Sequence, residues 1–320
     1  MTEPTAALID ESGRAAGLVR RPAGSALALA AGLLRTARPR QWMKNGLVLA
    51  APFAAARLLT GAEVVRLAVV LVLFTACAAS VYLINDARDA EADRAHPVKC
   101  LRPVASGLVP VAAAYTAGAA LAVAAFATAA MACNPDTAAL LAGYVLMQLA
   151  YCVWLKHILV VDLVIVTTGF LMRAMAGGVA LDIQLSRWFL ITSGFGALFM
   201  VAAKRYSELV LVSARQDVGA TRALLGSYTT GYLRFVWQLA AGVAVLAYCL
   251  WAMETGGRPH GLLPWRQLSM IPFILSVLRY AVFADAGSAG APEDVVLRDR
   301  ALLLIALGWG VLYVLAVVNQ

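Results

Sequence analysis

The sequence predicts an all-α polytopic membrane protein, and three observations support this prediction. Hydrophobic residues make up 62% and charged residues 14% of the 320 residues, whereas a soluble domain has about 45–50% and about 25%. Apolar segments recur from about residue 45 to the C-terminus with only short polar gaps. Each segment is long enough to cross a bilayer core as a helix. We therefore expect one integral-membrane domain, residues 36–320.

Residues 1–35 have a different composition from the rest. They are rich in Ala, Gly, Arg and Pro and lack the apolar core of a signal peptide. We expect a mobile cytosolic N-terminal tail here. Within it, residues 26–34 are predicted to form a short helix on the membrane surface, because this stretch is too short to span the bilayer.

Nine membrane spans are predicted from the apolar segments. They are 45–60, 63–84, 109–131, 137–155, 158–179, 188–204, 232–253, 267–284 and 300–318. Most Lys and Arg residues fall in alternate gaps between these spans, and retained positive charge marks the cytosolic side. We expect a multi-pass protein of the plasma membrane, with the N-terminus and the active site in the cytosol and the C-terminus outside.

Charge and cysteine usage exclude several classes of protein. The net charge is +8, but the cations gather on one membrane face without an RNA-binding or helix-turn-helix pattern, so we expect no nucleic-acid partner. The five cysteines form no C-x-x-C pair, and the three histidines lack i, i+4 spacing. A zinc or other transition-metal site is therefore not predicted.

A carboxylate cluster directly follows the predicted second span, in Asn85-Asp86-x-x-Asp89-x-x-x-Asp93. The i, i+3, i+7 spacing of its three acids places them on one face of a helix. Like charges on one face repel unless a cation lies among them, and Mg²⁺ prefers oxygen ligands together with substrate phosphates. We expect Asn85, Asp86, Asp89 and Asp93 to hold Mg²⁺ and a diphosphate, with the three aspartates as catalytic residues.

Basic residues follow these acids at Arg94, Lys99 and Arg102. Arginine offers a planar fork and lysine a point charge to phosphate oxygens, so the mixture favours a polyphosphate pocket over a bare metal site. A second polar cluster closes the sixth span and comprises Lys204, Arg205, Tyr206 and Glu208. Because Lys204 and Glu208 are one turn apart, this cluster fits either substrate binding or a simple ion pair at a helix end.

Charged residues also lie in or beside the predicted fifth span, at Lys156, Asp162 and Arg173. Charge at membrane depth is costly and marks functional sites, so we expect these residues to line a substrate cavity. Pairing with neighbouring helices is the alternative for Asp162 and Arg173. At the cytosolic end of the first span, the candidate phosphate-binding residues are Gln41, Lys44 and Asn45.

These motifs resemble those of the UbiA superfamily of intramembrane prenyltransferases, over about residues 36–318. The resemblance rests on the Asn85 to Asp93 motif after the second span and on the polar motif after the sixth. It implies a bundle of nine helices around a cytosol-facing cavity, in which two Asp-rich motifs hold a prenyl diphosphate through Mg²⁺. The second motif of the superfamily is D-x-x-x-D, whereas here Lys204 replaces the first acid and Glu208 is the remaining carboxylate.

This departure, together with Arg38-Pro-Arg-Gln-Trp-Met-Lys-Asn45 and His96-Pro-x-Lys-x-x-Arg-Pro103, resembles the branch of decaprenyl-phosphate phosphoribosyltransferases. The resemblance implies transfer of the 5-phosphoribosyl group of phosphoribosyl diphosphate to a polyprenyl (decaprenyl) phosphate, for a cell-wall arabinan precursor. It implies that the first motif and its bases bind the diphosphate. The second cluster would engage the ribose and its 5-phosphate.

Two other functions fit parts of the pattern. An ordinary UbiA-type prenyltransferase, with a prenyl diphosphate donor and an aromatic acceptor, predicts a second acidic pair after the sixth span, where Lys204 stands instead. A lipid or solute transporter would also use many spans and buried charges, but transporters tend to have internal repeats and midplane charges. A homo-oligomer is a possible state, as for other membrane enzymes of this size.

Overall fold

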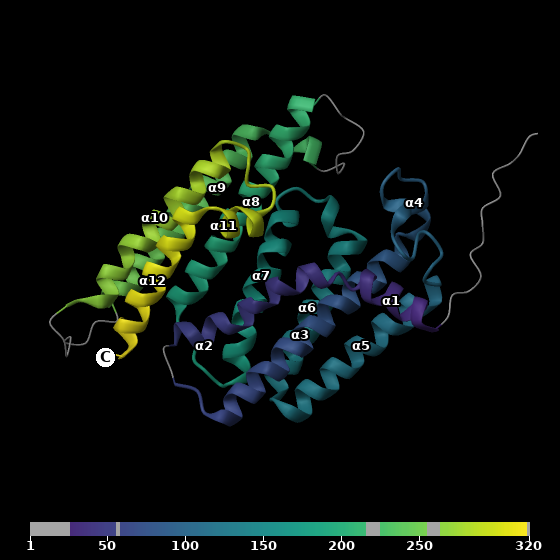
Figure 1. The fold of residues 1–320 in the computed structure, drawn as a ribbon, viewed down its shortest axis with the longest axis horizontal. Coiled ribbons are helices and arrows are strands. Elements are labelled where there is room, and N and C mark those ends of the chain that lie inside the picture. The colour runs from purple at the N-terminus through teal and green to yellow at the C-terminus, as the bar shows by residue number, and fades with distance from the viewer. Residues whose placement is uncertain (1–25, 56–57, 216–224, 255–262, 319–320) are drawn as a thin grey trace, which may run out of the picture.

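The computed structural model describes residues 26–55, 58–215, 225–254 and 263–318, and the described residues contain helices and no strands. Figure 1 shows two groups of helices, α1 to α7 and α8 to α12. The long helices are α3 (Gly61–Arg88), α5 (Val111–Ala132), α6 (Pro135–Val153), α7 (Val161–Ala180), α8 (Arg187–Arg215), α9 (Thr230–Glu254), α10 (Trp265–Asp285) and α12 (Arg300–Val318). The shorter ones are α1 (Ala26–Thr36), α2 (Ala50–Ala54), α4 (Ala90–Arg94), α11 (Pro292–Arg298) and the 3-10 helices η1 (Pro39–Leu49), η2 (Lys99–Leu101), η3 (Leu155–His157) and η5 (Leu225–Ser227).

Several long helices begin at side chains that satisfy their free N–H groups. The Thr60 side chain accepts a hydrogen bond from the Glu63 N–H, and the Glu63 carboxylate accepts one from the Thr60 N–H, which forms a capping box at α3. Asn134 caps α6 by accepting from the Thr137 N–H at 2.8 Å. Asp299 accepts from the Leu302 N–H at 2.7 Å at the start of α12. These local signals fix where the helices enter the bundle.

Six of the helices are long and apolar enough to cross a membrane, judged over the described residues. They are α3, α5, α6, α7, α9 and α10, and they coincide with six of the predicted spans. The predicted spans 188–204 and 300–318 lie within α8 and α12. The molecule is therefore a multi-pass membrane protein, and the count of nine spans stays a prediction.

The predicted first span, 45–60, is not one regular α-helix. The 3-10 helix η1 leads into α2, which ends at Ala54. Pro52 lies in α2 and has no N–H to donate, which interrupts the hydrogen-bond ladder of a regular helix at this point. α7 also approaches closely, since a Cβ atom added at Gly177 would lie 2.1 Å from the Val48 carbonyl oxygen.

Two hydrophobic cores lie on either side of α7. The first core joins η1, α3, α5, α6 and the C-terminal half of α7, around Phe74, Leu141 and Tyr144. The second joins the start of α7 to α8, α9, α10 and α12, around Leu163 and Leu233. α7 therefore links the two groups of helices in Figure 1.

A helix is present at the predicted residues 26–34, as α1, and its place on the membrane surface stays a prediction. Its Leu29 and Leu33 pack against a small cluster that includes Ala87, Val104 and Val109, beside the end of α3. Residues 1–25 of the predicted tail lie outside the described residues, so its boundary at residue 35 stays a prediction. α1 places the start of η1 beside the acidic motif.

Candidate functional site

The first acidic motif is held together by two arginines. Arg102 Nη1 lies 2.6 Å from Asp93 Oδ2 and 3.4 Å from Asp86 Oδ1. Arg38 Nη2 lies 2.7 Å from the same Asp86 oxygen. Both aspartates are buried, while the arginine side chains keep about a third of their surface exposed, at 34% for Arg38 and 29% for Arg102. The sequence analysis had predicted that Asp86, Asp93 and Arg102 share a site, and these contacts bring them together.

Arg38 is a site residue that the motif analysis did not select. Its backbone is left-handed, with φ 55°, at the start of η1, a conformation that costs a residue with a Cβ about 1–2 kcal/mol. Its guanidinium also lies 4.8 Å from the centre of the Tyr82 ring. The sequence signal was the Arg38 to Asn45 segment, in which the selected residues were Gln41, Lys44 and Asn45.

The three aspartates do not all lie on one uninterrupted helix. α3 ends at Arg88, Asp89 caps it, and Asp93 belongs to the short helix α4. Asp89 turns toward η3, where its Oδ2 lies 3.9 Å from Lys156 Nζ. Across the described residues, no three acidic, His or Cys side chains converge as a ready metal site. Asn85 is half-buried, and its carbonyl accepts the Asp89 N–H at 2.9 Å, so its side chain stays a predicted ligand.

The basic residues that follow the motif differ in their contacts. Arg94 is exposed, and its Nε donates to the Ala105 carbonyl at 3.2 Å, which holds the loop after α4. Lys99 is exposed, and its backbone N–H donates to His96 Nδ1 at 3.3 Å. Neither makes an ion pair with the Asp86 and Asp93 carboxylates as Arg102 does. Their predicted role in phosphate binding stays a prediction.

A second cluster forms at the junction of α6, α7 and α8. Buried Asp162 accepts from the Tyr151 hydroxyl at 2.6 Å and lies 3.2 Å from Arg205 Nη2. Arg205 Nη1 also lies 3.3 Å from Glu208 Oε2. Lys204 Nζ lies 3.9 Å from Glu208 Oε1, the i, i+4 pair predicted as the alternative for this cluster. Asp162 therefore pairs with a neighbouring helix.

Tyr206 lies on the opposite side of α8 from this carboxylate cluster. Its hydroxyl accepts from Arg234 Nη2 at 2.5 Å, and the Arg234 guanidinium lies 5.4 Å from its ring centre. The Tyr206 side chain is buried in the second core. Tyr206 thus joins α8 to α9, and its contact with ribose stays a prediction.

Arg173 and Asn45 form a separate buried network. Arg173 donates to Asn45 Oδ1 at 3.0 Å, to the Gly169 carbonyl at 2.7 Å and to the Tyr144 hydroxyl at 2.6 Å. Asn45 in turn donates to Thr75 Oγ1 at 3.1 Å. The aromatic rings of α3, α6 and α7 surround the guanidinium. These partners are uncharged, and they tie η1 to α7 and α3.

The other two candidates on η1, Gln41 and Lys44, are half-buried. They lie on the same short helix as Asn45, between the Arg38 end and the Arg173 network. Their predicted contacts with phosphate groups stay predictions. The network around Arg173 fixes the helix that carries them.

The α6–α7 connector lies between the two clusters. Lys156 reaches Asp89 of the first cluster, and six residues later Asp162 belongs to the second. The Val160 N–H donates to the Tyr228 hydroxyl at 2.9 Å, and burial raises the pKa of that phenol. Arg88 Nη1 donates to the Cys152 carbonyl at 2.7 Å, which fixes the connector on the end of α3. Carboxylates and cations from α3, α4, η3, α7 and α8 thus meet at one end of the bundle.

The amino-acid sequence matches the UbiA prenyltransferase family over residues 46–295. The chain therefore belongs to the UbiA prenyltransferase family. It is 50% identical over 288 residues to the decaprenyl-phosphate phosphoribosyltransferase of Mycobacterium tuberculosis, which covers 88% of this chain and 92% of the relative. The enzyme of the same name from Corynebacterium glutamicum is 44% identical over 90% of this chain and 87% of its own length.

Solved structures show the same fold. The UbiA homologue from Archaeoglobus fulgidus bound to DMAPP and Mg²⁺ superposes with a TM-score of 0.67 at 16% identity, over 90% of this chain and 99% of that chain. A digeranylgeranylglyceryl phosphate synthase structure gives a TM-score of 0.63 at 14% identity, over 91% and 99% of the two chains. The resemblance to the UbiA superfamily and to its phosphoribosyltransferase branch, drawn from the motifs, is confirmed.

Proposed function

We propose that the protein transfers the 5-phosphoribosyl group of phosphoribosyl diphosphate to a polyprenyl phosphate, decaprenyl phosphate in the first instance, and releases diphosphate. The observation that carries this proposal is the 44–50% identity, over most of both chains, with enzymes named decaprenyl-phosphate phosphoribosyltransferase. The site supports it, because its buried acids are interleaved with arginines and lysines. This mixture suits a donor with several phosphate groups.

In the proposed reaction the lipid phosphate is the nucleophile. One of its oxygens forms a bond to C1 of the ribose, and the bond from C1 to the diphosphate oxygen breaks. The electron pair of that bond leaves with the diphosphate. No general base is needed, because a phosphate monoester with a second pKa of about 6 is already ionised at neutral pH. The protein's task is to position two anions and to stabilise the leaving group.

Asp86, Asp93 and Arg102 are proposed to hold the diphosphate end of the donor. Arg102 touches both carboxylates through Nη1, and we propose that its other N–H groups bind the diphosphate. A guanidinium binds phosphate oxygens through two parallel hydrogen bonds, which fixes orientation as well as charge. Arg94 and Lys99, on the loop that follows, are proposed to meet outer phosphate oxygens.

Mg²⁺ is proposed as the cofactor, with Asp86 and Asp93 as its principal ligands and Asn85 and Asp89 beside them. The donor set fits, because Mg²⁺ is usually held by one or two carboxylates together with substrate phosphates and does not need a complete protein cage. When bound, it would supply positive charge at the leaving diphosphate. The Mg²⁺ in the Archaeoglobus fulgidus homologue supports this assignment at the level of the family.

The second cluster is proposed to bind the ribose and its 5-phosphate. Lys204 is half-exposed, and its partner Glu208 lies at 3.9 Å, so a phosphate group can compete for the ammonium. Arg205 is buried between Asp162 and Glu208, which suits a residue that positions the cluster. Lys156 on the connector faces the first cluster and is proposed to neutralise charge between the two.

The cations of these clusters also support the proposed orientation in the plasma membrane. The connectors after α3, α6 and α8 meet at one end of the bundle through contacts such as Lys156 to Asp89 and Val160 to Tyr228. Positive charge is retained on the cytosolic side. We therefore place this end, and the N-terminus, in the cytosol, where a water-soluble sugar diphosphate is available.

An assay with two pairs of substrates tests the proposal against the prenyltransferase alternative. Purified protein in detergent with Mg²⁺ receives either ribose-labelled phosphoribosyl diphosphate and decaprenyl phosphate, or a labelled prenyl diphosphate and an aromatic acid. We expect label in an organic-extractable lipid with the first pair and no transfer with the second. Transfer with the second pair alone would replace the proposal by ordinary prenyl transfer.

Two controls accompany this assay. The Asp93→Asn variant tests whether the transfer belongs to the proposed site, and it should lose the lipid product. Vesicles that contain the protein and enclosed labelled sugar diphosphate test the transporter alternative. Release of unchanged donor from those vesicles, without a lipid product, would favour transport.

A further inference from the structure

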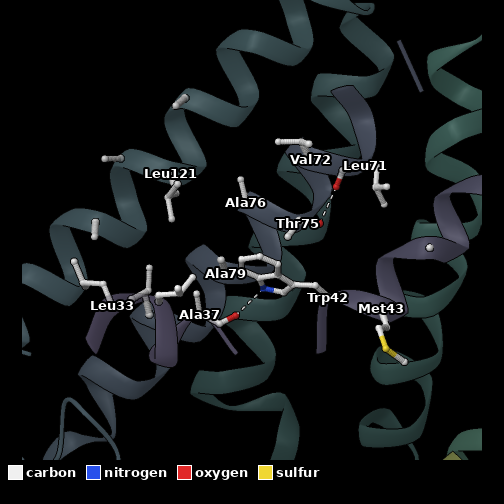
Figure 2. Close-up of a pocket in the computed structure, with 16 residues that line it drawn as sticks. Leu33, Ala37, Trp42, Met43, Leu71, Val72, Thr75, Ala76, Ala79 and Leu121 are labelled. Atoms are coloured by element: carbon white, nitrogen blue, oxygen red, sulfur yellow. Dashed lines mark hydrogen bonds between the residues drawn. The ribbon is translucent and has the colours of Figure 1, made fainter. Parts of the chain in front are cut away.

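An apolar groove of about 1070 Å³ lies on the outside of the first group of helices. This volume slightly exceeds the range of about 300–1,000 Å³ for small-molecule pockets. Residues from α1, η1, α3 and α5 line the groove, and Figure 2 shows them around the ring of Trp42. The proposed reaction uses the acids at the end of α3 and leaves this groove without a role.

The wall formed by α5 consists of three alanines and Leu121. One row of small residues on α5, which includes Gly118, packs directly on α3, where an added Cβ atom would lie 2.8 Å from the Ile84 side chain. A neighbouring row, Ala117, Ala120 and Ala124, lines the groove instead. Toward lipid a leucine would be as favourable as an alanine. The alanines therefore create space along α3 and are not needed for packing in that row.

The groove ends at the acidic motif. Leu83 lines the groove and lies three residues before Asp86, so the two side chains share a face of α3. Ala37 lines the groove and directly precedes Arg38, which pairs with Asp86 at 2.7 Å. Trp42 and Ala79 also line the groove, and the Trp42 Nε1 donates to the Ala37 carbonyl at 2.9 Å (Figure 2). The apolar wall is thus continuous with the proposed transfer site.

The charge at this end of the groove is positive. Arg35 is exposed at the end of α1, Arg40 is exposed on η1, and Arg38 lies between them with a third of its side chain exposed. Neither α1 nor η1 contains an acidic residue. A long apolar channel with a cationic end matches an anion on an apolar chain. A helix from a second copy of the protein would fill the channel but would not by itself supply an anion for the exposed Arg35 and Arg40.

We propose that the groove holds the isoprenoid chain of the polyprenyl phosphate acceptor, with the acceptor phosphate at Arg38. This inference rests on the proposed function and adds the place and direction of acceptor binding. The first isoprene units lie along Ala37 and Leu83, and the later ones pass Ala120 and Ala124 toward the middle of the bilayer. Arg38 contacts the acceptor phosphate while Arg102 stays on the donor side of Asp86.

The position of Ala124 permits a test by chain length. The antiparallel packing of α5 on α3 places Ala124 at the end of the groove far from Arg38, beside Val72 and Ala76. Ala124→Trp should block a long chain but not a short one. We expect the KM for decaprenyl phosphate to rise about tenfold or more and the KM for geranyl phosphate to change less than about twofold.

The matched control is Val123→Trp on the same turn of α5. Val123 is 65% exposed and does not line the groove, so the KM values for both acceptors should stay unchanged. Arg38→Gln should raise the KM for both acceptors, since both carry the phosphate. Equal effects of Ala124→Trp and Val123→Trp, or equal effects of Ala124→Trp on the long and the short acceptor, would overturn the proposed chain position.

A binding experiment separates failure of this inference from failure of the proposed function. Unaltered protein without donor is photolabelled with a decaprenyl phosphate that carries a diazirine near the end of its chain, and labelled peptides are identified by mass spectrometry. We expect label on α3 and α5 segments that line the groove, displaced by decaprenyl phosphate and not by phosphatidylglycerol. This readout requires no turnover, so it stands even where the transfer assay is negative.

Three results would overturn the inference. Label outside the groove would place the chain elsewhere. Displacement by phosphatidylglycerol at equal concentration would make the groove a general lipid site. A smaller oligomer for Ala124→Trp, with unchanged acceptor kinetics, would make the groove a contact between copies of the chain.

Discussion

Asp162 Oδ1 lies 3.2 Å from Arg205 Nη2, and both side chains are buried. This ion pair joins the first turn of α7 to the C-terminal half of α8, and so it connects the two groups of helices at the level of the site. Asp162 also accepts from the Tyr151 hydroxyl at 2.6 Å. The pair therefore fixes the second cluster relative to the connector that carries Lys156.

Removal of one member of this pair should destabilise the protein. Asp162→Ala leaves the Arg205 guanidinium buried with Glu208 as its remaining carboxylate, and loss of one partner of a buried ion pair costs about 3–5 kcal/mol. We expect a clear fall in the thermal unfolding temperature in detergent. The unfolding temperature of Asp162→Asn should fall less, because the asparagine can still accept the hydrogen bond from Tyr151. Identical melting of Asp162→Ala and the unaltered protein would show that the pair contributes no stability.

Arg102→Lys tests the bridge between the two buried aspartates. A lysine cannot contact Asp86 and Asp93 as the arginine fork does. A hydrogen bond to a charged group is worth about 1.5–3 kcal/mol, so kcat/KM for the sugar diphosphate should fall about 10- to 100-fold. Arg298→Lys, at an exposed i, i+4 pair on α11, is the control and should be nearly neutral. Equal activities of the two variants would argue against the proposed diphosphate site.

Gly177→Ala tests the close contact of α7 with the η1–α2 segment. The added methyl group would lie 2.1 Å from the Val48 carbonyl oxygen, so one of the two segments must move. Overpacking of this kind costs typically about 1–3 kcal/mol, and the unfolding temperature should fall. Gly196→Ala on α8, where nothing lies within 4 Å of the new atom, should keep or raise it, because alanine favours helix. A lower unfolding temperature for Gly196→Ala than for Gly177→Ala would contradict the described packing.

Asp299, at the start of α12, predicts how the stability of the fold depends on pH. The hydrogen bond from Arg279, followed by that from the Leu302 N–H, holds the pKa of Asp299 below its ordinary value of 3.8. A carboxyl group with a lowered folded pKa stabilises the fold above its unfolded pKa, and this contribution disappears as pH falls through the folded pKa. The unfolding temperatures of the unaltered protein and Asp299→Asn should therefore differ by a constant amount at neutral pH and converge below pH 3.8. A difference in unfolding temperature that persists at lower pH would show that it does not come from the ionised Asp299 carboxylate.

The sequence predicted the parts of this fold that depend on local pattern. Apolar length located six helices that can span the membrane, and i, i+4 spacing predicted the Lys204–Glu208 pair. The clustering of Asp86 and Asp93 with Arg102 also followed from short spacing. What short spacing could not indicate was the break at Asp89, because the end of α3 depends on the loop packing around α4.

Contacts between distant segments were outside the reach of the sequence pattern. Arg38 pairs with Asp86 across 48 residues, and its backbone is left-handed, which sequence spacing does not predict for an arginine. Arg173 finds Asn45 across 128 residues in a network of uncharged partners. Arg173 and Asn45 had been selected as candidate site residues, whereas Arg38 had not. The partners of all three depend on how η1 lies against α3 and α7.

The direction of transfer is tested most directly by tracing the phosphorus atoms of the donor. Purified protein receives decaprenyl phosphate and phosphoribosyl diphosphate that is labelled either in its 5-phosphate or in its diphosphate. We predict that the 5-phosphate label enters the lipid, one equivalent for each diphosphate released, and that the diphosphate label stays in water. Diphosphate label in the lipid, or release of diphosphate without a labelled lipid, would contradict phosphoribosyl transfer to the lipid phosphate.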